Sequence, residues 1–210
     1  IQGLPFFKLL HMNDSKINIV GFSEYEEGLD SVISDLVFDK SFPLGLNDLN
    51  SKISFYDIND NYALIFNEDD DTPDMVKIEN DEDYIPEGEE VVISCLKSNS
   101  HPKQGVMIYK IAYKDKSLVY ATDTEGYVGA NKKLVLFARD TDLLIHDAQY
   151  TSEEYLNAYF SKQGYGHSTF DMALETFSQA KAKSLAFFHF DPNYNDEFLL
   201  EIENHYTENC

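Results

Sequence analysis

The last seventy residues of the chain alternate strand-like segments with helix-like ones, and this order constrains the fold more than any other feature. Asp142–His146 (DLLIH) and Ser184–His189 (SLAFFH) have the short apolar composition of buried strands. Between them, Thr151–Lys162 and Ser168–Ala182 each begin with a hydroxyl residue followed three positions later by an acidic residue. That spacing is typical of helix N-termini. Strand–helix–strand order predicts an α/β fold in which helices cover a sheet.

The earlier part of the chain adds further short strands and one helix. The predicted strands are Ile17–Gly21, Lys52–Ile58, Tyr62–Phe66, Val91–Leu96, Val106–Tyr113 and Ser117–Thr122. The last two should form a hairpin, because only a tight turn at Asp115-Lys116 separates them. Ser23–Phe38 is predicted to be a helix with Ser23 as its N-cap, and a final helix is expected after Asn195.

Residues 67–90 differ in composition from the rest, since 12 of these 24 residues are acidic. The apolar clusters MVKI and DYI favour a loop or hairpin with an acidic tip over a disordered tail. The segment lacks the spaced aspartates, glycine and distal glutamate of a calcium-binding loop. We therefore expect a single domain over residues 1–210 with an acidic insertion or loop at 67–90.

The charge balance limits the partners that the chain can bind. With 16 basic and 38 acidic residues, the net charge is −22. Affinity for long nucleic acids depends on lysine and arginine contacts to phosphates, so a long polyanion is not expected as a partner. No apolar run approaches the ~18 residues of a membrane span. Two scattered cysteines, Cys95 and Cys210, form neither a disulfide framework nor a metal motif, which favours a reducing, cytoplasmic setting.

Histidines and aspartates gather beside the predicted strands of the second half. They are His101, Asp123, His146, Asp147, His167 and His189. In layered α/β proteins the ends of strands are where ligands converge. Imidazole and carboxylate together suit zinc, iron or manganese. Each residue also has a structural alternative, because a lone histidine is often a hydrogen-bonded core residue and an aspartate after a strand often caps a turn. The metal hypothesis depends on their combination.

Five stretches resemble metallo-β-lactamase-fold hydrolases in order and spacing. They are SHPKQGVMIYKI, VYATDTEGY, LLIHDAQYT, GYGHSTF and FFHFDPNY. The resemblance is closest to the branch that includes phosphodiesterases and tRNA 3′-end processing endonucleases, whose GHST motif is present at Gly166–Thr169. It implies an α/β fold of the αββα sandwich type.

The resemblance also implies the roles of the site residues. His101, Asp123 and His189 match metal ligands, and Asp123 would bridge two ions. Asp147 takes the place of the acid in the family's HEAT motif, and it would hold His167 as the proton donor to the leaving group. The implied cofactors are two divalent ions, zinc first, with manganese or iron as alternatives.

The family's H-x-H-x-D-H motif does not occur in the 210 residues. Ile1–Phe7 looks like the stretch that follows this motif, so the resemblance implies an N-terminally truncated fold. Such a chain is expected to hold metal partially or not at all and to be inactive or impaired as a hydrolase. An incomplete sheet would also expose an edge, which predicts possible self-association.

The functional expectation is a metal-dependent hydrolase of phosphodiester bonds, acting on a small phosphodiester or nucleotide. Two alternatives remain open: a non-catalytic binding module that keeps the scaffold, and a hydrolase of another ester, thioester or lactam, because fold alone does not choose the substrate. Tyr165 and Tyr194 lie beside the proposed site and could stack on a base or simply pack. His146 is expected to make a backbone hydrogen bond, and Ser168 to cap a helix rather than act as a nucleophile.

Overall fold

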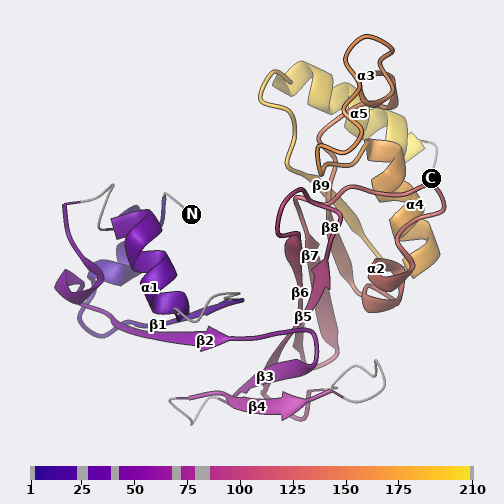
Figure 1. The fold of residues 1–210 in the computed structure, drawn as a ribbon. Helices are drawn as coiled ribbons and strands as arrows, with labels where there is room; N and C mark the ends of the chain where they lie inside the picture. The colour runs from indigo at the N-terminus through magenta and orange to yellow at the C-terminus, as the bar shows by residue number, and fades with distance from the viewer. Residues whose placement is uncertain (1–2, 23–27, 39–42, 68–71, 79–85, 209–210) are drawn as a thin grey trace. The chain divides into compact units, whose positions relative to one another are not determined.

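The structure, a computed structural model, describes residues 3–22, 28–38, 43–67, 72–78 and 86–208 (Figure 1). The chain divides into two compact units, Ile1–Tyr62 and Ala63–Cys210. The elements of the first unit are β1 (Lys16–Gly21), α1 (Leu29–Ile33), a π-helical turn (Ser34–Phe38), β2 (Lys52–Asp57) and short 3-10 turns at Leu4–Phe6, Lys8–His11 and Leu46–Asp48. Strands β1 and β2 pair in parallel. Their small core is built from Leu10, Leu29, Ile33, Val37 and Phe38.

The helix predicted over Ser23–Phe38 is shorter in the structure. Helix α1 begins at Leu29, because Gly28 has an extended backbone with φ −62° and ψ 162°. The proposed cap, Ser23, lies outside the described residues. The predicted strands at Lys52–Ile58 and Ile17–Gly21 are confirmed to within one residue.

The second unit is built on a mixed sheet in the order β4-β3-β5-β6-β7-β8-β9 (Figure 1). The strands are β3 (Tyr62–Phe66), β4 (Asp74–Lys77), β5 (Val91–Ser98), β6 (Val106–Tyr113), β7 (Lys116–Ala121), β8 (Leu143–Asp147) and β9 (Leu185–Phe188). Strands β5, β6 and β7 pair antiparallel, whereas β7, β8 and β9 pair in parallel. Strands β5, β7, β8 and β9 therefore run in one direction, and their carboxyl ends meet at one edge of the sheet.

Helices cover one face of this sheet. They are α2 (Lys132–Phe137), α4 (Phe170–Ala180) and α5 (Asp196–Glu208), while the short α3 (Ser152–Tyr155) belongs to the segment that follows β8. Alternate strand residues, among them Ile108, Val119 and Leu144, are fully buried in one cluster with Leu134 of α2 and Ala180 of α4. In Figure 1, α2 and α4 lie on the same side of the strands. Among the described residues, no helix is long and apolar enough to cross a membrane.

Several predicted boundaries in this unit were wrong. The hairpin turn lies at Lys114-Asp115, one residue earlier than predicted, and Lys114 adopts a left-handed φ of 51°. Helix α2 was not predicted, although Asn131 caps it by accepting a hydrogen bond from the Lys133 N–H. The acidic segment 67–90, predicted to be a loop or hairpin, contains β4, and β4 pairs with β3 as in the hairpin alternative; residues 68–71 and 79–85 lie outside the described part.

The two predicted helices before β9 are also shorter than expected. The helix over Thr151–Lys162 is limited to α3, although its predicted capping box between Thr151 and Glu154 is confirmed. The Asn157 side chain accepts hydrogen bonds from the backbone N–H groups of Tyr159 and Phe160, which competes with continuation of the helix. Helix α4 begins at Phe170, and its N-cap is Thr169 rather than Ser168.

Candidate metal centre

The candidate site residues lie at the edge where the parallel strands end. Each comes from a different strand end or adjoining loop: His101 follows β5, Asp123 follows β7, Asp147 ends β8, His167 precedes α4 and His189 follows β9. Because β5, β7, β8 and β9 share a direction, the topology delivers these side chains to one place. Residues separated by almost ninety positions in the sequence thus become neighbours.

Distances confirm that the five side chains lie together. The His189 Nε2 atom lies 3.5 Å from Asp123 Oδ1. Ligand-type atoms of His101, Asp123 and His167 all lie within 4.8 Å of one another. The His167 ring stacks on His189 at 4.8 Å between centroids and meets the edge of His101 at 5.5 Å. The structure therefore brings together every residue that was predicted for the site.

The backbone is strained at two of these positions. Asp123 has a φ of 53° and His189 a φ of 62°, so both are in the left-handed region that few non-glycine residues adopt. Such conformations cost of order 1–3 kcal/mol each and concentrate at functional sites. His189 comes directly after β9, and Asp123 comes two residues after the end of β7. The two residues with left-handed backbone are thus two of the five whose side chains lie at this edge of the sheet.

Asp147 is completely buried and both of its carboxylate oxygens are occupied. Oδ2 accepts a hydrogen bond of 2.9 Å from Nδ1 of His167. Oδ1 accepts hydrogen bonds from the backbone N–H groups of Ser168 (2.9 Å) and Gln149 (3.3 Å). Ligand-type atoms of Asp147, His167 and His189 also lie within 4.8 Å of one another, so these three residues are close enough to hold a metal ion. The oxygens of Asp147 are already satisfied, so we assign it to orienting His167 rather than to binding metal.

The environment of His167 shifts its pKa upward. Partial burial of the ring is the largest single effect and lowers the pKa, but the hydrogen bond to Asp147 and the negative charges of Asp147, Asp123 and Glu125 together outweigh it. The pKa of His167 is therefore raised above its ordinary value of 6.5. The Asp147 contact uses Nδ1, which leaves Nε2 as the ring atom that can act toward a ligand. His167 is thus oriented and favoured in its protonated form.

Glu125 is a functional residue that the sequence reasoning missed. Its Oε1 accepts hydrogen bonds from the Tyr155 hydroxyl (2.6 Å) and the Gly164 N–H (2.7 Å), and its Oε2 accepts one from the Gly166 N–H (3.0 Å). The carboxylate therefore fixes the segment that leads into His167. The sequence feature that could have indicated Glu125 is its position two residues after Asp123, in the same ATDTEG turn.

Ser168 is buried and joins the same two loops from the other side. Its hydroxyl donates to the Thr124 carbonyl at 2.6 Å and accepts from the Gly126 N–H at 2.9 Å. The Thr124 hydroxyl in turn shares a hydrogen bond of 2.6 Å with Ser100, one residue before His101. Ser168 is therefore a bridge between loops and not the helix cap that was predicted.

Two other predicted residues are structural. His146 is completely buried, which lowers its pKa, and its Nδ1 donates to the Asp147 carbonyl at 2.8 Å. The expected backbone hydrogen bond is present. Tyr194 packs between Phe170 and Phe198, and its hydroxyl donates to Glu154, so its ring belongs to the core around α5.

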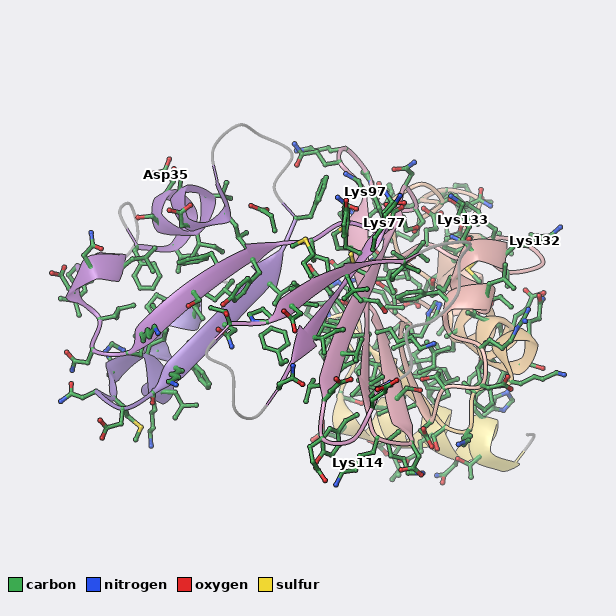
Figure 2. The ribbon with its side chains drawn as sticks, turned by 90° about the horizontal axis from the view of Figure 1, so that it is seen from below. Asp35, Lys77, Lys97, Lys114, Lys132 and Lys133 are labelled. Carbon is green, nitrogen blue, oxygen red and sulfur yellow. The ribbon has the colours of Figure 1, made fainter. Side chains whose placement is uncertain are left out.

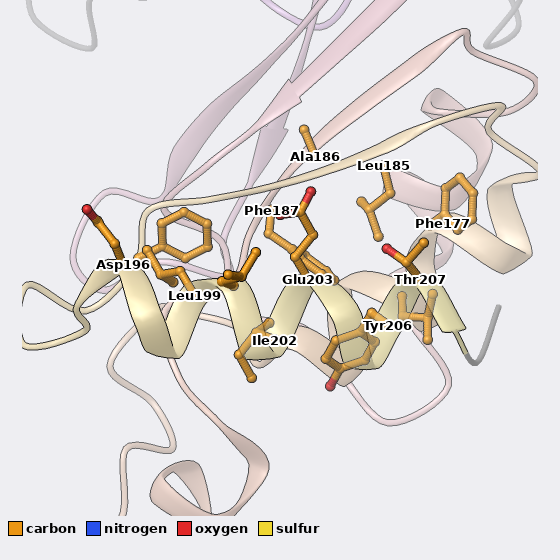
Figure 3. Close-up of a pocket in the computed structure, with 13 residues that line it drawn as sticks. Phe177, Leu185, Ala186, Phe187, Asp196, Leu199, Ile202, Glu203, Tyr206 and Thr207 are labelled. Carbon is orange, nitrogen blue, oxygen red and sulfur yellow. The ribbon is translucent and has the colours of Figure 1, made fainter.

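A pocket of about 840 Å³ lies elsewhere, between α4, β9 and α5 (Figure 3). Its apolar lining includes Phe177, Leu185, Phe187, Leu199, Ile202 and Tyr206. None of the five candidate site residues lines it. The pocket is therefore separate from the chemistry at the strand ends.

Comparison with known proteins identifies the family. The model of the β-lactamase superfamily domain matches residues 54–190, which include every candidate site residue. The chain belongs to this family. The predicted metallo-β-lactamase α/β fold is thereby confirmed, while one domain over residues 1–210 stays a prediction.

Curated relatives of this superfamily member support the predicted branch of phosphodiesterases and RNA-processing enzymes. Ribonuclease Z of Thermococcus sibiricus is 36% identical over 107 residues, which cover 51% of this chain and 28% of that protein. Ribonuclease Z of Bacillus subtilis is 34% identical over 90 residues, 43% of this chain and 27% of that one. The chain spans little more than a quarter of the length of these relatives.

Solved structures show the same fold at low sequence identity. The metallo-β-lactamase fold protein YhfI from Bacillus subtilis superposes with a TM-score of 0.54 at 15% identity, covering 95% of this chain and 61% of that chain. Zn²⁺-bound PqqB from Methylobacterium extorquens gives a TM-score of 0.53 at 12% identity, covering 93% of this chain and 63% of that chain. Both similarities concern the fold alone.

The donor set of this superfamily member fits a divalent cation. His101 and His189 offer imidazole nitrogens, and Asp123 offers a carboxylate that is 43% exposed and lies 3.5 Å from His189 Nε2. Nitrogen and oxygen donors of this kind suit zinc, and also manganese or iron. By distance, His101, Asp123 and His167 form one possible ligand group and Asp147, His167 and His189 form another.

Proposed function

We propose that the chain is part of a metal-dependent phosphodiester hydrolase that acts on a small phosphodiester or nucleotide. The observation that supports this most is the buried Asp147–His167 pair, which lies directly beside His101, Asp123 and His189. An oriented proton donor next to three metal-type ligands is what the hydrolysis of a diester with a poor leaving group requires.

Each residue then has a separable role. His101, Asp123 and His189 would hold the cation, with a second ion as the family resemblance implies. The cation would supply an activated water and neutralise charge on the phosphoryl oxygens. His167 gives a proton from Nε2 to the departing oxygen. Asp147 fixes the ring through Nδ1 and stabilises its positive charge. Because three ligands are few for two ions, we expect low activity from these 210 residues.

The leaving group provides the sharpest test of this assignment. A nitrophenolate is a stable anion and departs without a proton, whereas a nucleoside alkoxide needs one. With zinc added, His167→Ala should slow the hydrolysis of thymidylyl-3′,5′-thymidine by roughly 10²–10⁴-fold. The same change should slow bis(4-nitrophenyl) phosphate far less. Equal losses on both diesters would show that His167 is not the proton donor.

The same assay separates the alternative functions. A chromogenic β-lactam and a thioester, tested in parallel, should react more slowly than either diester. The relatives are named ribonucleases, so an RNA oligonucleotide is included, and preference for it over the dinucleotide would overturn the small-substrate proposal. Any longer natural chain that contains these residues should be assayed too. Absence of both zinc binding and hydrolysis there would favour a non-catalytic binding module.

A further inference from the structure

Residues 156–165, between α3 and the GHST motif, form an exposed aromatic segment beside the candidate metal centre. The rings of Tyr159, Phe160 and Tyr165 are 99%, 62% and 47% exposed. Large aromatic side chains gathered at one surface usually mark a binding site. Tyr165 is two residues from His167, so this surface adjoins the proposed chemistry.

The segment is irregular but firmly held at its base. The Lys162 N–H donates to the Tyr155 carbonyl and the Tyr165 N–H to the Lys162 carbonyl, each at 3.1 Å. Glu125 binds the Gly164 and Gly166 N–H groups at 2.7 and 3.0 Å. The exposed rings are therefore presented by an ordered backbone, in a fixed position relative to His167.

Lys162 is positioned among these rings. Its Nζ lies 4.6 Å from the centroid of Phe160 and 5.5 Å from those of Tyr150 and Tyr165. Tyr150 contacts the edge of the His167 ring at 6.2 Å between centroids, which connects the cluster to the centre. Over the described residues, no carboxylate pairs with Lys162, although the chain carries 38 acidic residues. Its positive charge is therefore available to an external anion.

Lys114 is another lysine of this chain that lies over an aromatic ring, and it pairs with a carboxylate. Its Nζ lies 5.0 Å from the centroid of Tyr113, but it also pairs with Glu89 at 2.8 Å. Lys114 lies at the β6–β7 hairpin (Figure 2). This hairpin precedes β7, whereas the candidate centre lies after the carboxyl end of β7. Of these two lysines beside aromatic rings, Lys114 has a carboxylate partner and Lys162 has none among the described residues.

We propose that Phe160, Lys162 and Tyr165 form a nucleotide-recognition surface, in which Tyr165 stacks on the base and Lys162 pairs with a phosphate oxygen. The proposal rests on the proposed function, and it specifies the substrate class as a phosphodiester that carries a nucleobase. An aromatic face and a cation are the two features that bind a nucleotide without selecting its base. Of the two tyrosines that the sequence placed beside the site, Tyr194 packs into the core and Tyr165 is the one exposed for stacking.

The test compares adenosine 5′-monophosphate with ribose 5-phosphate, which share a phosphate and differ by the base. Binding is measured by NMR titration with a chelator present, so that the result does not depend on metal binding or hydrolysis. The wild type should bind the nucleotide more tightly. Tyr165→Ala should weaken nucleotide binding roughly 5- to 100-fold without affecting ribose phosphate. Tyr165→Phe should retain it, and Lys162→Gln should weaken both probes.

Tyr113→Ala and Lys114→Gln are matched controls, since they remove a similar pair at the far end of the sheet, and neither should change binding. Equal affinity for the two probes, no binding of either, or an equal effect of Tyr113→Ala would overturn the proposal. If adenosine 5′-monophosphate binds more tightly than ribose 5-phosphate but no zinc-dependent hydrolysis is detected, this surface is supported and only the proposed function is contradicted. Hydrolysis without that difference would contradict only this surface.

Discussion

Gly166 illustrates how a single residue determines the position of a proposed metal ligand. Its φ is +94°, and a Cβ added there would lie 2.4 Å from Pro102 Cδ and 2.7 Å from His101 Cδ2. Gly166→Ala should therefore displace the His101 ring and weaken zinc binding, measured by calorimetric titration. It should also lower the urea midpoint, because a left-handed alanine costs about 1–2 kcal/mol.

Gly164 provides the matched control for that experiment. Its φ is +81°, but an added Cβ would meet nothing within 4 Å. Gly164→Ala should show the backbone cost alone and keep the zinc affinity. If both variants bind zinc as the wild type does, the His101 ring is not positioned by this contact.

The gathering of the five candidate site residues at one edge could be predicted from the sequence, whereas the residues that support them could not. His101, Asp123 and His189 follow apolar segments whose strand character is evident, and shared strand direction brings them together. Glu125 was missed because its role depends on backbone N–H groups forty residues away, which no local pattern reveals. Ser168 was assigned to a cap because local spacing suggested one, while its tertiary bond to Thr124 decides its role.

At the scale of elements, Asp142 joins the parallel strands at their amino ends. It accepts hydrogen bonds from Lys183 Nζ at 2.9 Å, the Ser117 N–H at 3.0 Å and Lys116 Nζ at 3.3 Å. These contacts, Lys183 first, lower the pKa of Asp142 from 3.8 to about 2. A carboxyl whose pKa is lower in the folded state stabilises the fold above its unfolded pKa and loses that effect as the pH falls.

Asp142→Asn should therefore reduce the free energy of unfolding most at neutral pH. The difference from wild type should shrink as the pH falls from about 4 toward 2, as followed by urea unfolding. Asp115→Asn is the control, because Asp115 is 81% exposed and pairs with Lys116 at the hairpin. A difference between wild type and Asp142→Asn that stays constant with pH would be inconsistent with this role.

Element types were more predictable than element ends. The strands from β5 to β9 were located to within two residues, because apolar β-branched runs mark them clearly. The helix predicted over Thr151–Lys162 had a correct start, since the capping box is local. Its end depends on Asn157 and on contacts of the following segment with Glu125, which a local pattern does not contain.

At the scale of the whole molecule, the net charge opposes self-association, whereas the outer strands of the sheet favour it. Strands β4 and β9 are the outer strands of the described sheet, and such edges favour pairing between chains. A net charge of −22 opposes association through repulsion, which salt screens. We expect light scattering to show a molar mass that rises above the monomer value with protein concentration, and more so at high salt. A monomer under all conditions would contradict self-association.

The convergence of His101, Asp123 and His189 on one cation is tested most directly by zinc titration of the wild type and His189→Ala, with His205→Ala on α5 as the control. The wild type and the control should bind zinc alike. His189→Ala should bind it more than about 100-fold more weakly, because losing a ligand should exceed the roughly 10- to 100-fold effect of losing a group that only orients one. Equal zinc affinity in all three proteins, or no zinc binding by the wild type, would contradict the assignment.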